Sequence, residues 1–297
     1  MTIIGMGKLR LRLWVLALLP ILVFPLRAIV LFLVGNEMFD RLLLHKVTSD
    51  LEMSHSHLQH IQDQALDATS SLANSRRIQE LVFIGRTNTS LIEVIESRKQ
   101  NLGFDFLTIL DTQGNVIVNS EGMASRSIYP DLPMVRDAMR NQRGKAGLAV
   151  LSPEQMMRLS PNLPDRARIG LLDTPLAAPT AAKEEGRGMM VIAVAPMMNE
   201  VGVAVGYVVG GVLLNRYEKI VDFLSEIVSA GGLRQMNIKG TVTIFLDDVR
   251  ISTTVRRDDG ERAIGTRISQ AVGDAVIGRG ETWQKRAFVV NHWAMTA

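Results

Sequence analysis

Cysteine is absent from the 297 residues of the sequence. This absence excludes disulfide bonds, CxxC redox chemistry, zinc sites built from cysteine and a cysteine nucleophile. It does not exclude an extracytoplasmic location, because a chain of this size folds without disulfides. With 47% hydrophobic and 21% charged residues, the composition indicates about two globular domains with a sizeable core.

Most of the chain also has no excess of positive over negative residues. The sequence has 33 Lys and Arg residues against 30 Asp and Glu residues. Lys8, Arg10 and Arg12 account for the whole difference, and all three precede the first long apolar run. We therefore attribute the pI of about 9.3 to a cluster that flanks a membrane, and we expect no nucleic-acid partner.

The motifs of common enzyme classes are missing as well. The sequence has no Gly-x-Ser-x-Gly elbow, no His-Glu-x-x-His and no kinase or cyclase signature. Gly206, Gly210 and Gly211 lie in an apolar strand pattern without a following Lys-Ser or Lys-Thr. They indicate close packing of a strand against a helix, not a phosphate-binding loop. We expect no catalytic site in these residues and no cofactor.

Three of the five histidines, His55, His57 and His60, lie close together in the sequence. His57 and His60 fall on one face of a helix, as metal ligands do, but no carboxylate completes a site in that register. We interpret them as part of a solvated helix face and predict no metal site.

The run from residue 13 to residue 34 is apolar except for Arg27. Its length suits the roughly 20 residues that cross a bilayer. A cleaved signal peptide is the alternative, but no cleavage site with small residues follows. The sequence therefore predicts a transmembrane helix over 13–34 and a cytoplasmic basic tail over 1–12, because cationic flanks stay inside. Residues after about 35 would lie outside the bacterial inner membrane.

Beyond the membrane, the apolar residues of 37–100 recur at steps of three and four, which predicts a long helical stalk. A break is expected near Asn74-Ser75 or near Gly85. Residues 101–214 predict a membrane-distal module in the order of a PAS-like antiparallel sheet, with a tight turn at Asp111–Gly114. Within it, residues 153–188 are rich in Pro, Ala and charge and predict a long surface loop.

The same plan then starts again. Residues 215–232 predict a connecting helix ended by Gly231-Gly232, and residues 233–297 predict a membrane-proximal module. This second module stops at Ala297 within its expected penultimate strand, so we expect a fragment of a longer protein. The predicted fold class is α+β, with a transmembrane helix, a long membrane-exit helix and two PAS-like modules, the second truncated.

This order of elements resembles the double-Cache sensory region of bacterial sensor histidine kinases and chemoreceptors. The segments that carry the resemblance are KVTSDLEMSH (46–55), GLAVLSPEQM (147–156), RGMMVIAVAPMMN (187–199), GYVVGGVLLNRYEKIVD (206–222), GTVTIFLDDVRISTTVRRDDGERAIGTRIS (240–269) and RAFVVNHWAMTA (286–297). The resemblance implies a periplasmic sensor of small molecules, with a two-component histidine kinase as the full-length protein. A chemotaxis receptor or a cyclase input domain is the alternative within the class.

The resemblance extends to kinases that sense citrate and dicarboxylates. In those kinases an Arg-x-x-His on one strand and a later arginine bind the ligand. Arg250 and Arg286 match the two arginines, and Thr253 stands in place of the histidine. The resemblance thus implies a ligand-binding site at these three residues, possibly for a carboxylate, which suits a guanidinium fork. An internal pair, such as Arg250 with Asp248, is the alternative.

Two further expectations concern partners and function. The stalk has a narrow apolar stripe that one module cannot fully cover, so we predict a parallel homodimer through this helix, as in related receptors. A membrane-anchored envelope enzyme on the same scaffold is the alternative from another class. It would need a nucleophile or a metal cluster in the loop of residues 153–188, which has no histidine.

Overall fold

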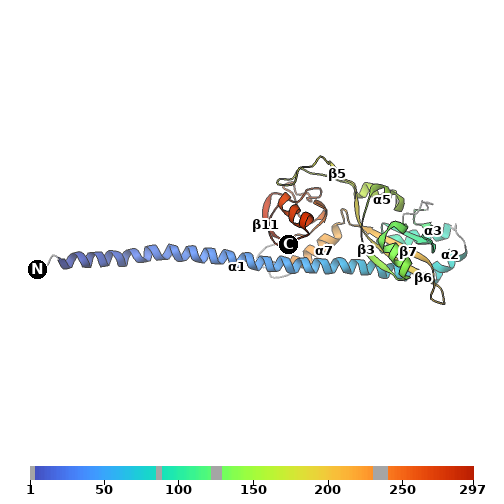
Figure 1. Cartoon of the computed structure of the whole chain (residues 1–297), viewed down its shortest axis with the longest axis horizontal. Helices are drawn as coiled ribbons and strands as arrows, with labels where there is room; N and C mark the ends of the chain where they lie inside the picture. Colours follow the sequence, from blue (N-terminus) through green and yellow to red (C-terminus); the bar gives the residue numbers. More distant parts are fainter. Residues whose placement is uncertain (1–3, 85–88, 122–128, 230–239) are drawn as a thin grey trace.

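The computed structural model of the chain describes the backbone of residues 4–84, 89–121, 129–229 and 240–297, and their side chains from residue 23 onward except near 83–89. A helix of 70 residues, α1 (Ile4–Ala73), leads from the N-terminal end into two globular bodies that lie along its far half (Figure 1). Among the described residues, no helix is long and apolar enough to span a membrane. Residues 13–22 of the predicted span lie outside the described side chains.

The stalk breaks at the first of the two predicted positions. After α1 come α2 (Arg76–Ile84) and α3 (Thr89–Leu102), while Gly85 lies outside the described residues. The carbonyls of a helix's last turn need partners from outside the helix. Here the side chain of Gln79 donates to the oxygen of Ala73 at 2.8 Å, which satisfies the end of α1 as the chain turns.

A five-stranded antiparallel sheet forms the first body and confirms the predicted PAS-like arrangement. We call it the distal module, after its predicted position. The strands, in sheet order, are β2 (Val116–Asn119), β1 (Phe106–Leu110), β7 (Ala204–Leu213), β6 (Gly188–Met198) and β3 (Lys145–Leu151). The turn between β1 and β2 has the predicted chemistry. Asp111 accepts from the backbone N–H of Asn115 at 2.9 Å, and Gly114 adopts a φ of 84°.

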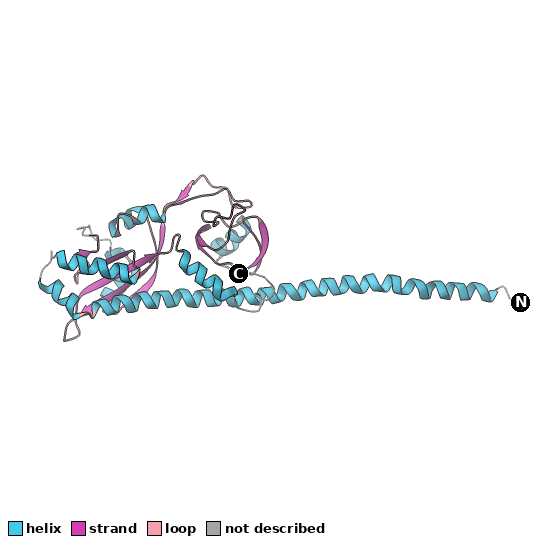
Figure 2. Ribbon diagram, turned by 180° about the vertical axis from the view of Figure 1, so that it is seen from behind, coloured by secondary structure: helices cyan, strands magenta, loops and turns pink. Residues whose placement is uncertain are grey.

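The two faces of this sheet bury different layers, as the alternation of side chains along a strand requires. On one face, Leu107 and Val191 belong to a core shared with Ala65 and Leu72 of α1. On the other, Phe106 and Ile192 belong to a core shared with α4 (Pro133–Asn141), α5 (Pro153–Leu159) and α6 (Leu163–Ala167). Figure 2 shows the strands between the long helix and these shorter helices.

The glycines of β7 do not serve the predicted contact with a helix. A Cβ on Gly210 would meet the ring of Phe104, and a Cβ on Gly211 would meet the ring of Phe106 and the backbone oxygen of Val191, each at 2.7 Å. Gly206 is similarly close to the oxygen of Leu110. The glycines therefore admit aromatic rings and neighbouring strands against the centre of the sheet.

The prediction of a long surface loop with little regular structure over residues 153–188 was wrong for its first part, which forms α5 and α6. Ser152 caps α5 by accepting from the N–H of Gln155, whose side chain accepts in return from Ser152. Pro153 occupies the first turn, where its missing N–H is tolerated. The remainder matches the prediction more closely, since only the short β4 (Ile169–Gly170) and β5 (Glu184–Glu185) interrupt an irregular course.

The second body, which we call the proximal module after its predicted position, follows α7 (Glu218–Ser229), and α7 packs on α1. The Phe223 ring of α7 lies 4.7 Å from the ring of His57, and Lys46 donates to the oxygen of Val228 at 3.0 Å. His57 is therefore partly covered, unlike His55 and His60, which are exposed. The glycines expected to end α7, Gly231 and Gly232, lie outside the described residues.

Two separate hairpins represent the second predicted sheet in the part of the chain that is described. One pairs β8 (Thr243–Leu246) with β9 (Val249–Thr253), and the other pairs β10 (Lys285–Val289) with β11 (His292–Thr296). In the distal sheet, β7 pairs with both β1 and β6 and so joins the two halves of that sheet. Among the described residues, no strand joins the two proximal hairpins in this way. Between the two proximal hairpins, α8 (Gln270–Gly273) continues as a π-helical turn, Asp274–Gly278.

Candidate ligand site around Arg250

Arg250 lies on β9, a strand whose side chains are buried at every position. One edge of β9 pairs with β8, and the other edge is covered by residues 263–268. On that second edge, Arg250 N–H donates to the oxygen of Thr266, and Gly265 N–H donates to the oxygen of Arg250, each at 2.9 Å. Both edges are thus satisfied, so the strand lies inside the module although its sheet has only two strands.

The guanidinium of Arg250 is almost completely withdrawn from water, with 4% of the residue exposed. Its Nη1 donates to the Thr266 hydroxyl at 2.7 Å, and its Cζ lies 5.1 Å from the centre of the Phe245 ring. Its Nε has no hydrogen-bond partner among the described residues, and none of their ion pairs involves Arg250. Burial lowers the pKa of Arg250 to about 10.

The internal pair of Arg250 with Asp248 is not formed. Asp248 instead binds Arg267, whose Nε and Nη2 donate to one carboxylate oxygen at 2.9 and 2.5 Å. Arg250 therefore keeps a buried charge that no carboxylate of the described chain neutralises. Such a charge is unfavourable unless an anion is supplied.

Thr253 is fully buried at the end of β9. Its hydroxyl shares a hydrogen bond of 2.6 Å with the hydroxyl of Thr243 and accepts from the N–H of Val255 at 3.0 Å. The pairing of β8 with β9 shifts register between Arg250 and Thr253, so their side chains do not follow the simple alternation of a regular strand. The structure therefore gives Thr253 a set of partners different from that of Arg250.

Arg286 lies on β10, in the other hairpin, and its side chain is 61% exposed. Its Nη2 contacts Asp40 of α1 at 2.7 Å. The structure thus places the three predicted ligand residues in three separate sets of contacts. Of these three residues, only Arg250 combines a buried charged group with a hydrogen-bond donor that has no partner in the described chain, as an anion site shielded from water requires.

Thr266 and Phe245 were not predicted as neighbours of Arg250. An apolar pattern ahead of Asp247-Asp248 is the local signal for Phe245, which pairs with Arg250 across the hairpin. Thr266 had no comparable signal, because residues 263–268 have neither helical nor strand periodicity. Arg262 was missed for the same reason, although it bonds both oxygens of Asp222 on α7 at 2.8 Å.

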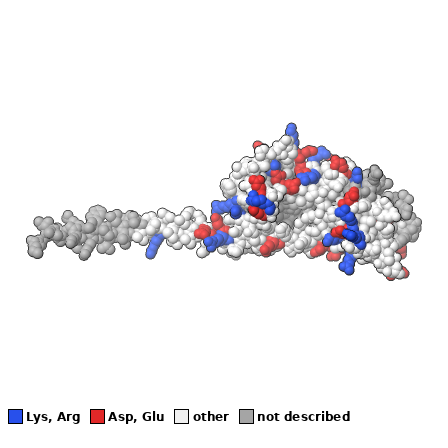
Figure 3. Space-filling model, viewed as in Figure 1, with Lys and Arg blue, Asp and Glu red and all other residues white. Residues whose placement is uncertain are grey.

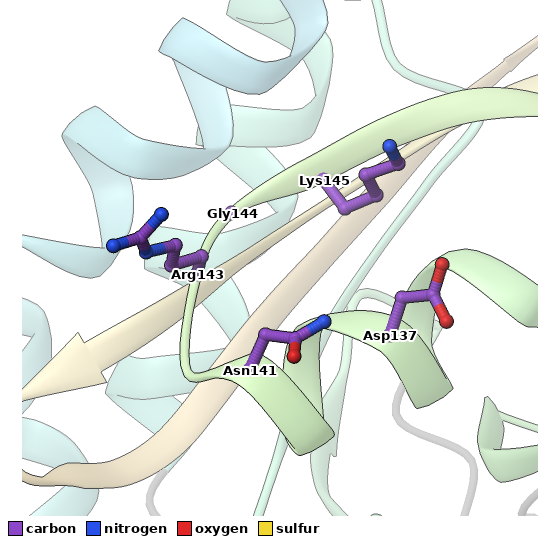
Figure 4. Close-up of a pocket in the computed structure, with 5 residues that line it drawn as sticks. All are labelled: Asp137, Asn141, Arg143, Gly144 and Lys145. Atoms are coloured by element: carbon purple, nitrogen blue, oxygen red, sulfur yellow. The ribbon is translucent and has the colours of Figure 1, made fainter.

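A cavity of about 470 Å³ lies in the distal module, at the end of α4 and the start of β3. Its lining residues are Asp137, Asn141, Arg143, Gly144 and Lys145, and Figure 4 shows the first two on α4, opposite the segment that carries the others. All five are exposed. Water and salt therefore screen the charges of this cavity, and each contact there is weaker than one to the buried Arg250.

The described residues hold no group of three or more His, Cys, Asp and Glu side chains arranged as metal ligands. Burial, which is the larger cause, and the neighbouring charge of His60 both lower the pKa of His57.

Charged side chains of both signs alternate over the visible face of the two bodies, as Figure 3 shows. The buried guanidinium of Arg250 is thus the feature of the described chain with the clearest capacity to select a ligand by charge.

Two sequence families match the chain. The family described as the double sensory domain of two-component sensor kinase matches residues 42–233. The family described as single cache domain 3 matches residues 212–297. A search of curated proteins gives no match.

Solved sensor domains also resemble the structure. The periplasmic domain of LuxQ from Vibrio cholerae is 12% identical, with 73% of this chain and 82% of that chain covered and a TM-score of 0.45. The sensor domain of the histidine kinase DctB from V. cholerae is 13% identical, with coverages of 72% and 68% and a TM-score of 0.39. The ligand-binding domain of the amino acid chemoreceptor PctC from Pseudomonas aeruginosa PAO1, in complex with GABA, is 12% identical, with coverages of 75% and 78% and a TM-score of 0.34.

All three scores lie below 0.5, so the assignment rests on the sequence families. The first of them covers most of the chain, from the stalk to the connecting helix. The second covers the proximal module. The chain therefore belongs to the double-Cache family of sensory domains of two-component sensor kinases.

Proposed function

We propose that this chain is the extracytoplasmic sensing region of a membrane receptor, and that the receptor is a two-component histidine kinase. The family description, which names two-component sensor kinases, supports the kinase output. A chemotaxis receptor and a cyclase are the alternative outputs. In each case the chain would bind a small molecule and alter the packing of the stalk.

The ligand of this proposal is a small carboxylate, and Arg250 is its main partner. The observation that supports it is a buried guanidinium without an ion-pair partner in the described chain and with an unused Nε donor. A planar guanidinium binds a carboxylate with two parallel hydrogen bonds. Such a ligand would supply the missing negative charge and satisfy the free donor, which together would offset the desolvation of the charge.

Thr253 and Arg286 are further ligand contacts in this proposal, and each would have to exchange a present partner for the ligand. The hydroxyl of Thr253 would leave Thr243, and the guanidinium of Arg286 would leave Asp40. Asp40 belongs to α1, so the second exchange would break a contact between the proximal module and the stalk. Ligand binding would then be transmitted to the helix that leads toward the membrane.

The membrane anchor over residues 13–34 is supported by the described part of that run. Large apolar side chains between residues 23 and 34 are exposed, and Figure 3 shows this part of the helix nearly free of charge. A helix surface of this kind is stable in lipid and not in water. The N-terminus would lie in the cytoplasm, and residues after about 35 would lie outside.

The homodimer through the stalk is supported by a second group of exposed apolar side chains. Met38, Phe39, Leu42 and Met53 of α1 are between 40% and 66% exposed. They lie beyond the part of α1 that the distal sheet covers. A parallel α1 from a second copy would bury them.

A melting experiment on the full chain in detergent tests the ligand proposal. Succinate, citrate and a panel of amino acids are added to the wild type, Arg250→Ala, Arg250→Lys and Arg279→Ala, the last removing an exposed arginine paired with Glu281. We expect one acid to raise the melting temperature of the wild type and of Arg279→Ala. At a concentration 100 times Kd, the stabilisation is about 2.7 kcal/mol.

The two substitutions of Arg250 should respond differently from this control. Arg250→Ala should lose the shift, and Arg250→Lys should keep only part of it, because an ammonium cannot form the bidentate fork. If no acid shifts the wild type, or if Arg250→Ala retains the full shift, Arg250 is not a carboxylate-binding residue.

A further inference from the structure

A segment of the distal module, residues 171–178, crosses to the proximal module and runs along residues 263–270. We refer to the first as the strap and to the second as the roof. Figure 1 shows the chain ahead of β5 crossing between the two bodies. Leu172 N–H donates to the oxygen of Gly265 at 2.9 Å, and Gln270 N–H donates to the oxygen of Leu176 at 2.7 Å. Ala177 and Ser269 form an antiparallel bridge next to the second of these bonds.

The roof is also the segment that shields Arg250. Thr266 lies in its centre, is 3% exposed, and binds both the backbone and the side chain of Arg250. Gly265 has a φ of 85°, and a Cβ at this position would overlap the oxygen of Gly170. The roof therefore lies between two layers, with Arg250 on one side and the strap backbone on the other.

Arg267 joins the three parts. Its Nε and Nη2 bind Asp248 at the turn of the β8–β9 hairpin, and its Nη1 donates to the oxygen of Ala178 in the strap at 2.6 Å. Its backbone N–H donates to the hydroxyl of Thr174 at 3.0 Å. Hairpin, roof and strap thus depend on one side chain that is 12% exposed.

The strap has the properties of a segment that opens locally. It belongs to no helix and no sheet apart from the bridge, and Leu176 is 59% exposed with a φ of 64°. A left-handed conformation is unfavourable for leucine. Segments with few buried contacts and exposed backbone bonds open more readily than the modules that they connect.

We propose that the strap is a latch on the Arg250 site, through which the distal module controls access to the proximal one. The latch holds the roof closed over Arg250, and release of the strap allows the roof to lift. This inference rests on the proposed function for the identity of Arg250 as a ligand residue. Closure itself is a property of the unliganded chain, so its test needs no ligand.

The absence of natural cysteines makes a disulfide test direct. Ala177 and Ser269 face each other in the bridge and form no hydrogen bond to one another, and such pairs have Cα atoms about 4.5 Å apart. That separation lies within the range of a disulfide. The double variant Ala177→Cys/Ser269→Cys should therefore lock the strap when oxidised and leave it free when reduced, with the same sequence in both states.

Access to Arg250 is measured with phenylglyoxal, which modifies arginine side chains, followed by mass spectrometry of the full chain. We expect oxidation of the double variant to slow the modification of Arg250 at least tenfold. Arg143, which is exposed in the distal cavity, should react at the same rate in both states. Equal rates at Arg250 in the two states would overturn the latch.

A second pair of variants excludes a general change in stability. Thr174→Val removes the acceptor of Arg267 N–H and should speed the modification of Arg250 at least threefold. Thr180→Val, whose hydroxyl accepts from Ala182 of the same loop, should leave the rate unchanged. If the two variants react alike, the latch is wrong. If both tests succeed but no acid stabilises the protein, the latch stands and the ligand proposal fails.

Discussion

Arg286 of β10 and Asp40 of α1 form an ion pair of 2.7 Å, although 246 positions separate them in the sequence. The pair ties the last part of the proximal module to the helix that enters the structure first. Under the proposed function, it is also the contact that ligand binding breaks. The contribution of this pair to stability and to ligand binding can be tested by removing the carboxylate of Asp40 and leaving Arg286 in place.

Asp40→Asn should change stability little and ligand response more. Both side chains are well exposed, so the loss of the pair should lower the free energy of unfolding by less than about 1 kcal/mol. Arg286 would then be free for the ligand, and the affinity for the active acid should rise a few-fold in calorimetry. Glu37→Gln, which removes the exposed partner of Arg41 on the same helix, is the control. Equal affinities of Asp40→Asn and Glu37→Gln for the acid would show that Arg286 is not part of the ligand site.

Arg250→Met should make the unliganded protein more stable. The substitution replaces an unpaired buried charge by an apolar side chain of similar length, and such replacements stabilise by roughly 1–4 kcal/mol. Urea unfolding measures the difference. Arg267→Met is the matched comparison, and it should destabilise by about 1–3 kcal/mol because it leaves Asp248 without its partner. A loss of stability in Arg250→Met would indicate a structural role for that arginine.

His57 should make stability depend on pH between about 5 and 7. Burial, then the charge of His60, lowers the pKa of His57 in the folded protein. The unfolded chain therefore binds a proton more readily, and stability falls as the pH decreases from the ordinary histidine value toward the folded pKa. His57→Gln should reduce this decrease in urea unfolding at pH 5.5 and 7.5. His55→Gln, at an exposed position, should not, and equal slopes in both variants would contradict the assignment.

Single cysteines in α1 should report on the homodimer. Met38→Cys, Leu42→Cys and Met53→Cys place a thiol on the exposed apolar side of the helix. Because the protein has no other cysteine, oxidation should give a disulfide-linked dimer only when two copies meet there. Ala65→Cys, which is 5% exposed against the distal sheet, is the negative control. Cross-linking that is uniform along the helix, or absent, would count against a parallel dimer.

Local chemistry made several parts of the fold predictable. The hairpin of β1 and β2 follows from Asp111 and Gly114, whose turn geometry needs no distant partner. The break after Ala73 is visible as Asn74-Ser75 between two helical patterns. Ser152, Pro153 and Gln155 carried an equally local signal for α5, and that signal was outweighed by the high proline and alanine content of the following residues.

The site was harder to predict because its contacts join distant segments. A resemblance identified Arg250, but burial by the roof depends on residues 263–268, which have no regular periodicity. The partner of Arg286 depends on how β10 packs on α1, and no local pattern carries that information. The strap was correctly expected to be irregular, yet its pairing with the roof spans the two modules and follows from neither alone.

The stalk also sets a mechanical condition on any signal. The distal sheet packs on α1, Arg286 of the proximal module pairs with Asp40 of α1, and no proline interrupts the sequence between residue 37 and Ala73. At 1.5 Å per residue, this 70-residue helix extends for about 105 Å. Because α1 is continuous past the distal sheet, α7 and the Arg286–Asp40 pair, no hinge between these contacts can absorb a rotation or a shift. A movement of either module must therefore move α1 as a whole, or one of these contacts must break.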